Sequence, residues 1–344
     1  MKVLHYTVRP ASKRFYTSAG RTLCVDASEE WSARLLEKFF AGWHWSPLTP
    51  EFAPPPDALL RINSGDAPMH PRAGLESFEL ASGGRCLIDG ETYYFEEEDS
   101  LTIVHPRSPA RVEVWVGASP RARADAPLAR LIFNAAMAAM RRCGLFELHG
   151  GGVVEPSGEM AVLFVGPSGS GKSTLTTQMA AAGWQYLSDD SLLLSEGGRG
   201  VEARGLRRAF AVTEQTIDAA GLAHLREATT GPVPFDPLKR RFEPREVFPS
   251  GFAHSSLPRA IFFPLVTHER ESRLKALSQS EAMARLLKMS PWACYDKFSA
   301  RSHLGVLSEL ARQSASYELF AGTDLLGDPL YAAKFLGPRL GGAR

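Results

Sequence analysis

The sequence predicts an α/β protein in which a larger domain with a glycine-rich loop follows a smaller, mostly β domain. In the larger domain, an apolar run (161–165), a glycine-rich loop and a breaker-free segment (174–182) predict a strand, a loop and a helix. In the smaller domain, short alternating segments separated by turn residues predict strands. A chain of 344 residues, 44% of them hydrophobic, is long and apolar enough for two domains.

The composition argues against several classes of partner. The net charge of +1 gives no electrostatic reason to expect nucleic acid or an anionic membrane. The four cysteines are far apart and form no C-x-x-C pair, so we expect neither a zinc site nor a disulfide framework. The sequence shows no signal peptide and no apolar run approaching about 18 residues, so we expect a cytoplasmic protein without a membrane span.

Residues 1–118 are expected to form the smaller domain. Apolar residues at helical spacing predict a helix over residues 29–40, and the proline-rich stretch 47–56 predicts a loop or an extended segment. Asp89-Gly90 lies between two alternating segments and predicts a hairpin turn. No acid/base cluster stands out here, so we expect this domain to dock a substrate. The expected strands are residues 59–62, 77–80, 85–88, 92–95, 101–104 and 111–116.

Residues 119–127 contain two prolines among arginines and small residues, which predicts a linker. The larger domain is then expected over residues 128–338, and it begins with a helix over 128–142 that stops near Gly144. The prolines within 221–237 predict a loop. The second region begins at residues 146–154. Further strands are expected at 184–188, 257–263 and 317–320, and further helices at 281–289 and 297–312.

The glycine-rich loop fits a phosphate-binding pattern at every fixed position. Glycines let successive N–H groups point inward, and a helix N-terminus adds positive potential. The lysine would reach the β- and γ-phosphates, and the serine after it would ligate Mg²⁺. The sequence therefore predicts a site for a nucleoside triphosphate with Mg²⁺. The loop is Gly166, Pro167, Ser168, Gly169, Ser170, Gly171, Lys172 and Ser173, the pattern G-x-x-x-x-G-K-[ST], and Thr174 follows it.

An acidic pair, Asp189-Asp190, ends the strand expected at 184–188, shortly after the loop lysine in the chain. Beside bound phosphates, one carboxylate can hold Mg²⁺ and the other can accept a proton from an attacking hydroxyl. A bound cation would also relieve the repulsion between the two carboxylates. The alternative is that the pair forms an exposed strand-end turn or a helix N-cap.

Together these motifs resemble the HPr kinase/phosphorylase family of bacterial serine kinases. His149-Gly150, the glycine-rich loop, a helix ending at Gly183 and Asp189-Asp190 occur in that family's order and spacing. Residues 202–206 are similar to its E-x-R-G-L stretch, and residues 257–263 are similar to a late core strand. The resemblance covers about residues 126–338, and it implies a phosphoenolpyruvate-carboxykinase-like P-loop kinase fold for that region.

The resemblance also implies roles for single residues. In catalysis, His149 would lie beside the transferred phosphoryl group, Lys172 would bind the phosphates and Asp190 would be the general base for the acceptor serine. The metal-facing residues would be Ser173, Asp189 and Glu202.

Alternatives and departures accompany these roles. His149 can equally be a buried, hydrogen-bonded histidine, and Glu202 can be a surface charge beside a glycine-rich turn. The family's loop continues with Glu where this chain has Thr174, and Arg207-Arg208 replaces a glycine and an apolar run. The family's C-terminal basic segment has no clean counterpart. Lys239-Arg240-Arg241 is the nearest candidate for contacting phosphate, although three consecutive basic residues are more often solvated. These departures argue against HPr as the substrate and against phosphorolysis.

The expected function is an ATP- and Mg²⁺-dependent kinase that transfers the γ-phosphoryl group to a hydroxyl. The acceptor expected from the resemblance is a serine on a peptide or protein, ribosomally made peptides included. Two other classes stay open: a kinase for a small molecule such as free serine, and a non-catalytic ATP-gated binding protein or chaperone. The related bacterial kinase is an oligomer, so a homo-oligomer stays open too.

Overall fold

The computed structural model describes residues 12–27, 29–80, 83–106, 108–119, 125–219, 222–233, 236–248, 250–267 and 269–342. The chain divides into two compact units. The N-terminal unit runs to Ala41 and resumes from Trp45 to Cys143, and the P-loop unit comprises Gly42–His44 and the chain from Gly144 onward. A three-residue segment of the first part of the chain therefore belongs to the second unit.

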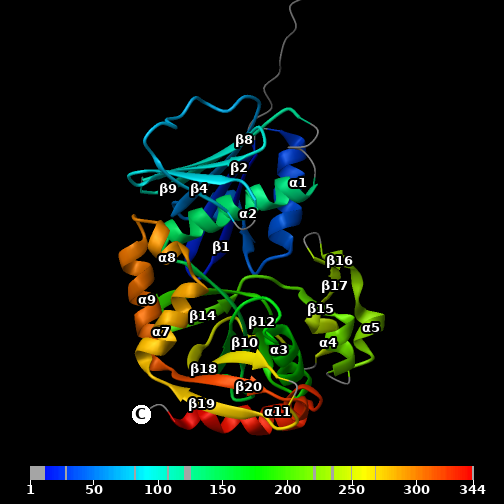
Figure 1. The fold of residues 1–344 in the computed structure, drawn as a ribbon. Coiled ribbons are helices and arrows are strands. Elements are labelled where there is room, and N and C mark those ends of the chain that lie inside the picture. The colour runs from blue at the N-terminus through cyan, green and yellow to red at the C-terminus, as the bar shows by residue number, and fades with distance from the viewer. Residues whose placement is uncertain are drawn as a thin grey trace, which may run out of the picture. The chain divides into compact units, whose positions relative to one another are not determined.

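The described strands of the N-terminal unit form one sheet (Figure 1), in the order β3-β1-β2-β4-β9-β8-β7-β6-β5. Strands β2, β4 and β9 are parallel to one another, and the other neighbours are antiparallel. The strands are β1 (Ser12–Ser18), β2 (Arg21–Ala27), β3 (Ser46–Leu48), β4 (Ala58–Ser64), β5 (Glu76–Glu79), β6 (Arg85–Asp89), β7 (Thr92–Glu97), β8 (Ser100–His105) and β9 (Ala110–Val116).

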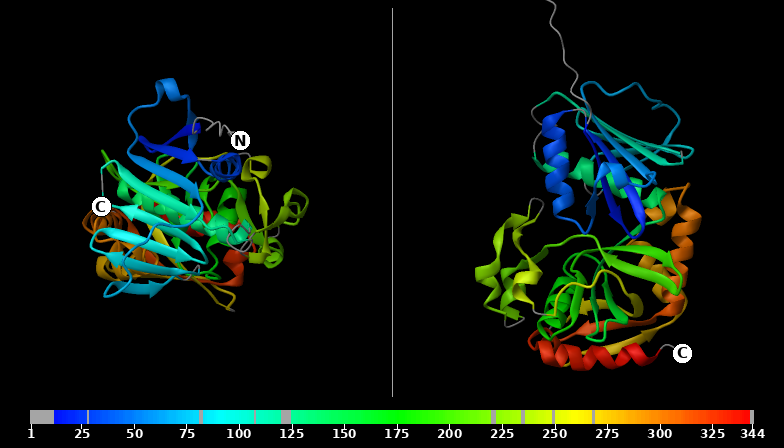
Figure 2. Two further views of the ribbon diagram at one scale, coloured as in Figure 1. Left: turned by 90° about the horizontal axis from the view of Figure 1, so that it is seen from above. Right: turned by 180° about the vertical axis from the view of Figure 1, so that it is seen from behind.

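Two helices cover the apolar side of this sheet (Figure 2). Helix α2 (Asp125–Arg142) packs on β4, β8 and β9, and α1 (Glu30–Ala41) packs on β2. Leu60 and Val112 of the sheet and Ile132 of α2 are fully buried. A short 3-10 turn, η1 (Pro50–Phe52), follows β3. The sequence assigned the helix at 128–142 to the larger domain, but the packing of α2 places it in the N-terminal unit.

The predicted helix 29–40, the hairpin turn at Asp89-Gly90 and the six predicted strands of this region are confirmed. The hairpin of β1 and β2 was not predicted. Strand β1 is mostly polar, so its own sequence gives a weak signal, and its position comes from pairing with β2 and β3. Of the expected linker, residues 120–124 lie outside the described residues, and Asp125 already begins α2.

The main sheet of the P-loop unit has the order β14-β13-β10-β11-β18-β20-β19, and β12 pairs with β10. Strands β11, β18 and β20 are parallel, and their outer neighbours β10 and β19 are antiparallel to them. The strands are β10 (Phe146–Val154), β11 (Met160–Val165), β12 (Gln185–Ser188), β13 (Ser191–Gly197), β14 (Gly200–Gly205), β18 (Leu257–Val266), β19 (Arg273–Leu277) and β20 (Ala315–Ala321).

Helices cover both faces of this sheet (Figure 1). In β11, Leu163 and Val165 join a core with α7 and α9, whereas Val162 and Phe164 join a core with α3 and α11. Both faces of β11 are apolar because both are buried. This confirms an α/β fold. The helices are α3 (Lys172–Ala181), α7 (Gln279–Lys288), α8 (Trp292–Tyr295), α9 (Ala300–Gln313), α10 (Thr323–Leu326) and α11 (Pro329–Leu336), followed by η2 (Gly337–Gly342).

A small sheet, in the order β15-β17-β16, lies between β14 and β18 in the chain. The expected loop at 221–237 is wrong in part, because it includes α5 and β16. Leu222 and Leu225 are buried in a core with Phe210 and Phe242, and this long-range packing outweighs the local proline signal. The elements are β15 (Phe210–Thr213), α4 (Glu214–Ala219), α5 (Leu225–Ala228), β16 (Thr230–Val233), β17 (Asp236–Phe242) and α6 (Pro244–Val247).

Across the described residues, none of the helices is both long enough and apolar enough to span a membrane.

Candidate active site

The glycine-rich loop connects β11 to α3, as predicted, and two of its glycines are required by geometry. Gly169 and Gly171 have φ values of 80° and 98°, a backbone conformation that side chains disfavour. A Cβ atom on Gly171 would also lie 3.0 Å from the Cγ2 atom of Val266 on β18. The loop can therefore curl tightly against β18 only with glycine at this position.

The loop presents hydrogen-bond donors. None of the hydrogen bonds found among the described residues uses the N–H of Gly169 or Gly171. The hydroxyl of Ser170 is buried, and it has no hydrogen-bond partner among the described residues. The ten-residue helix α3 begins directly after the loop, so its N-terminal N–H groups add positive potential. These donors fit an anion such as a phosphate chain.

Lys172, the first residue of α3, is 5% exposed. Its Nζ atom donates a hydrogen bond to the carbonyl oxygen of Pro167 at 2.8 Å. Burial and the charge of Lys239 lower the pKa of Lys172 to about 8, although Asp190 opposes this shift. The ammonium group therefore remains mostly charged at neutral pH, and it is held at the loop.

Asp190, in the turn between β12 and β13, lies beside His149 of β10. The Nδ1 atom of His149 is 3.4 Å from one carboxylate oxygen of Asp190, and Arg207 is 3.5 Å from the other. Burial opposes the ionised form, but His149, Arg207 and Lys239 together hold the pKa of Asp190 below its usual range. Burial lowers the pKa of His149. At neutral pH the pair is therefore a carboxylate beside a neutral imidazole.

Asp189 has different surroundings from its neighbour. It is 2% exposed, and its carboxylate accepts a hydrogen bond from the N–H of Ala211 at 2.9 Å. Burial and the adjacent charge of Asp190 raise the pKa of Asp189 to about 7. The Asp189 side chain thus positions β15. The backbone carbonyl oxygen of Asp189 lies 3.4 Å from the hydroxyl oxygen of Ser173.

Glu202 lies away from the loop. It pairs with Ser195 toward the turn end of the β13–β14 hairpin, and its carboxylate accepts a hydrogen bond from Arg204 at 2.8 Å. Ser195 is four residues from Ser191, the residue after Asp190, which is about 13 Å along an extended strand. The structure therefore does not bring Glu202 to Asp190.

A pocket of about 260 Å³ joins most of the predicted site residues. Of the predicted residues, Gly166, Pro167, Ser170, Asp189 and Glu202 do not line it. The lining residues are His149, Ser168, Gly169, Gly171, Lys172, Ser173, Thr174, Asp190, Ala211, Thr213, Gln215, Thr216, Lys239, Val266 and Leu326.

The sequence did not predict the contribution of β15, α4 and β17 to this pocket. Thr174 is 3.2 Å from Thr216, whose hydroxyl is 3.1 Å from that of Thr213. The Thr174–Thr216 contact joins segments some forty residues apart in the chain, so no local pattern could reveal it. The basic run that includes Lys239 was visible in the sequence, but its position was not.

The residues present fit Mg²⁺ in part. Among the described residues, no three His, Cys, Asp or Glu side chains converge on one point. Mg²⁺ bound with a nucleotide takes many of its ligands from phosphate and water, so one or two protein oxygens suffice. Ser173 and Asp190 supply such oxygens in the pocket, whereas the predicted set of Ser173, Asp189 and Glu202 is not assembled.

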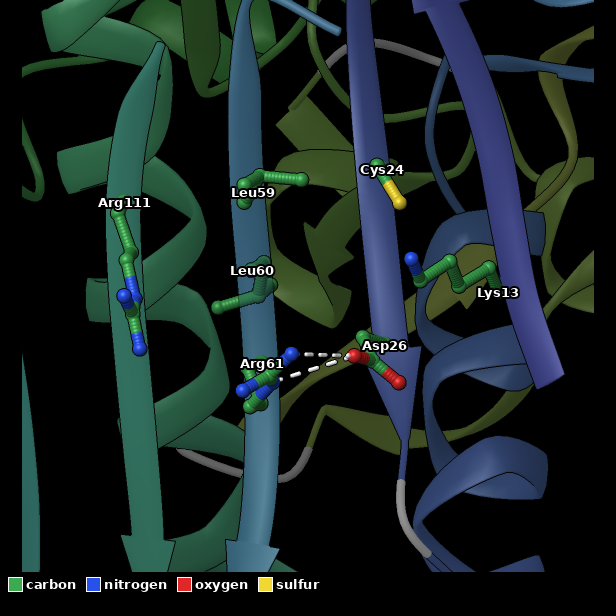
Figure 3. Close-up of a pocket in the computed structure, with 7 residues that line it drawn as sticks. All are labelled: Lys13, Cys24, Asp26, Leu59, Leu60, Arg61 and Arg111. Atoms are coloured by element: carbon green, nitrogen blue, oxygen red, sulfur yellow. Dashed lines mark hydrogen bonds and ion pairs between the residues drawn. The ribbon is translucent and has the colours of Figure 1, made fainter. Parts of the chain in front are cut away.

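A second pocket, of about 140 Å³, lies on the sheet of the N-terminal unit (Figure 3). Figure 3 shows Arg61 directed at Asp26, with hydrogen bonds of 3.0 and 3.1 Å. Arg111 pairs with Glu113 on the same strand. Two of the three cationic side chains around this pocket are thus already paired with carboxylates, so it is a weaker candidate for binding phosphate than the P-loop pocket.

In comparisons with known proteins, no family model matches this chain, and no curated protein matches it.

Proposed function

We propose that the P-loop unit is an ATP- and Mg²⁺-dependent kinase with a phosphoenolpyruvate-carboxykinase-like P-loop fold, and that it transfers the γ-phosphoryl group to a hydroxyl. One observation carries the proposal. A phosphate-binding loop with its buried lysine and the His149–Asp190 pair line the same pocket, although they come from separate elements. This is the combination that phosphoryl transfer requires, a cradle for phosphates beside a carboxylate that can accept a proton.

The chain's own residues divide the work. The loop N–H groups and Lys172 bind and orient the phosphate chain, and the oxygens of Ser173 and Asp190 would hold Mg²⁺. When bound, the metal neutralises phosphate charge. The Asp190 carboxylate, which is ionised at neutral pH, also accepts the proton of the acceptor hydroxyl. Neutral His149 orients that carboxylate from 3.4 Å.

The proposed acceptor is a serine on a peptide or protein. This part of the proposal comes from the resemblance to bacterial serine kinases, and the N-terminal unit is its proposed docking platform.

The test is transfer of label from γ-labelled ATP with Mg²⁺ to acceptors in an extract of the protein's own cells, with products resolved by mass. Wild type is compared with Asp190→Asn and with Glu196→Gln, which removes a carboxylate at an exposed position of β13. A labelled peptide or protein that is absent with Asp190→Asn and present with Glu196→Gln supports the proposal.

Two other results would redirect it. Label found only on a small molecule would assign the chain to the metabolite kinases. Tight ATP binding without transfer to any acceptor would contradict the kinase proposal and leave a nucleotide-gated binding protein.

A further inference from the structure

We propose that Lys239 of β17 is a second lysine of the triphosphate site, acting on the phosphate chain together with Lys172. The inference deepens the proposed function and rests on it, because it adds a ligand to the same nucleotide site. Neither the phosphate-binding motif nor the acidic pair includes this residue.

The side of β17 that faces the pocket follows from strand alternation. Thr213 lies opposite Lys239 in the antiparallel β15–β17 pair, and directly opposed residues share one face of a sheet. Thr213 and Lys239 both line the pocket. Val212 and Arg240 form the next pair, and Val212 is fully buried in the core on the other face. Lys239 therefore points into the pocket, whereas Arg240 points away from it.

Lys239 shares the pocket with side chains from three other parts of the fold. Lys172 of α3, His149 of β10 and Asp190 of the turn before β13 all line it. Lys239 therefore lies in the wall of the same pocket as the phosphate-binding loop and the acidic residue.

The position of β17 is fixed relative to the loop. Strand β15, to which β17 is paired, is held by the hydrogen bond from the N–H of Ala211 to Asp189. The Thr174–Thr216 contact of 3.2 Å joins the first turn of α3 to α4, which directly follows β15. Lys239 therefore lies on a strand whose partner, β15, is held by Asp189 and is followed by a helix that contacts α3.

A bound triphosphate would also give Lys239 a chemical role. The complex of ATP with one Mg²⁺ retains negative charge that Lys172 alone does not neutralise, and that charge shifts along the chain during transfer. Two ammonium groups in one pocket repel each other. An anion between them converts that repulsion into attraction. A lysine that is only solvated at a strand edge would not gain this attraction when a polyphosphate binds.

The first experiment measures binding of pyrophosphate, Mg–ATP and AMP to the full-length chain by calorimetry. We expect Lys239→Gln to weaken binding of pyrophosphate and Mg–ATP by about tenfold or more, the typical effect of losing a charge-assisted hydrogen bond. AMP binding should change less than about twofold. Lys239→Arg should restore most of the affinity. Arg240→Gln is the matched control, since it removes the neighbouring charge from the opposite face, and it should bind like wild type.

The second experiment uses only wild type, so it does not depend on how the variants fold. Amine acetylation followed by mass analysis should show that pyrophosphate protects Lys239 and Lys172 but not the exposed Lys13 of the N-terminal unit. Wild-type affinity in Lys239→Gln, or no protection of Lys239, would overturn the inference while leaving the kinase proposal intact. If wild type itself binds neither pyrophosphate nor Mg–ATP, both proposals fall.

Discussion

Asp189 and Asp190 are adjacent in the chain, yet the structure gives them separate tasks. Adjacent residues at the end of a strand point in opposite directions, so one carboxylate enters the pocket and the other binds the N–H of Ala211. The sequence could predict that the acidic pair lies near the phosphate loop, because the pair follows the loop lysine shortly afterwards in the chain, at the end of a predicted strand. It could not divide their roles, because the partner of Asp189 lies twenty-two residues further on.

The contact between His149 and Asp190 makes a specific prediction. His149→Ala should slow phosphoryl transfer by about 10- to 100-fold, because Asp190 loses the group that orients it. His149→Asn should cost less, since an amide can still donate a hydrogen bond to the carboxylate. Pyrophosphate affinity should stay within about threefold in both variants. Single-turnover transfer rates and calorimetry check this, and equal losses in both variants would show that His149 acts in another way.

For Glu202, the role that the resemblance implies does not agree with its position in the structure. The resemblance implies that it faces Mg²⁺, whereas the structure pairs it with Arg204 on the same strand, outside the pocket. We therefore expect Glu202→Gln to transfer phosphoryl groups within about twofold of wild type, with an unchanged Mg²⁺ dependence. The Mg²⁺ concentration that gives half-maximal transfer is the quantity to measure. A several-fold rise in that concentration would mean that the β13–β14 hairpin rearranges when nucleotide binds.

At the scale of the element, the strand–loop–helix unit was predictable because all of its determinants are local. The apolar run, the glycines and the breaker-free segment lie within about twenty residues, and each has one structural preference. By contrast, β15 and β17 reach the pocket through pairs such as Thr213 with Lys239, which are distant in the chain. The polar strand β1 escaped prediction for a different reason, because its own sequence gives only a weak strand signal.

The loop glycine next to Lys172 provides a test of the element itself. Gly171→Ala should abolish measurable pyrophosphate binding, because a Cβ atom there meets Val266 and forces the loop out of its φ of 98°. Gly158→Ala is the matched control. Gly158 also has a positive φ, 83°, but its Cβ atom would meet nothing within 4 Å. Both variants should lose about 1 kcal/mol of folding free energy or slightly more. If Gly158→Ala also lost binding, the effect would reflect instability rather than loop shape.

At the scale of the whole molecule, the chain does not divide where its sequence suggests. Segment Gly42–His44 lies inside the region expected to be one β domain, yet it belongs to the P-loop unit. The N–H of His44 donates to the carbonyl of Leu206, and the N–H of Arg208 donates to that of Gly42, each at 3.0 Å. Backbone pairing of this kind leaves no trace in the sequence, because any residue can make it. Arg207, which lies between these two bonds, contacts Asp190, as His149 does.

His44 connects this segment to the stability of the whole chain. Its ring stacks on Phe252 with centroids 3.7 Å apart, and burial, followed by the charges of Arg208, Arg245 and His254, lowers its pKa to about 3. In the unfolded chain a histidine binds its proton near pH 6.5, so between about pH 6.5 and 3 only the unfolded state takes up that proton. The stabilisation that the neutral, buried ring of His44 contributes is complete above pH 6.5, and it is lost as the pH falls through this window.

Each pH unit in that window costs at most about 1.4 kcal/mol for one such group. His44→Phe keeps an aromatic ring against Phe252 and removes the titration. The free energy of unfolding, measured in urea at pH 7.5 and pH 5, should therefore fall less in His44→Phe than in wild type. The difference between the two falls should approach 2 kcal/mol, since about 1.5 pH units of the window are crossed. If the free energy of unfolding falls equally in both proteins, His44 is accessible to protons in the folded state. The Gly42–His44 segment would then open from Leu206–Arg208 without unfolding the rest of the chain.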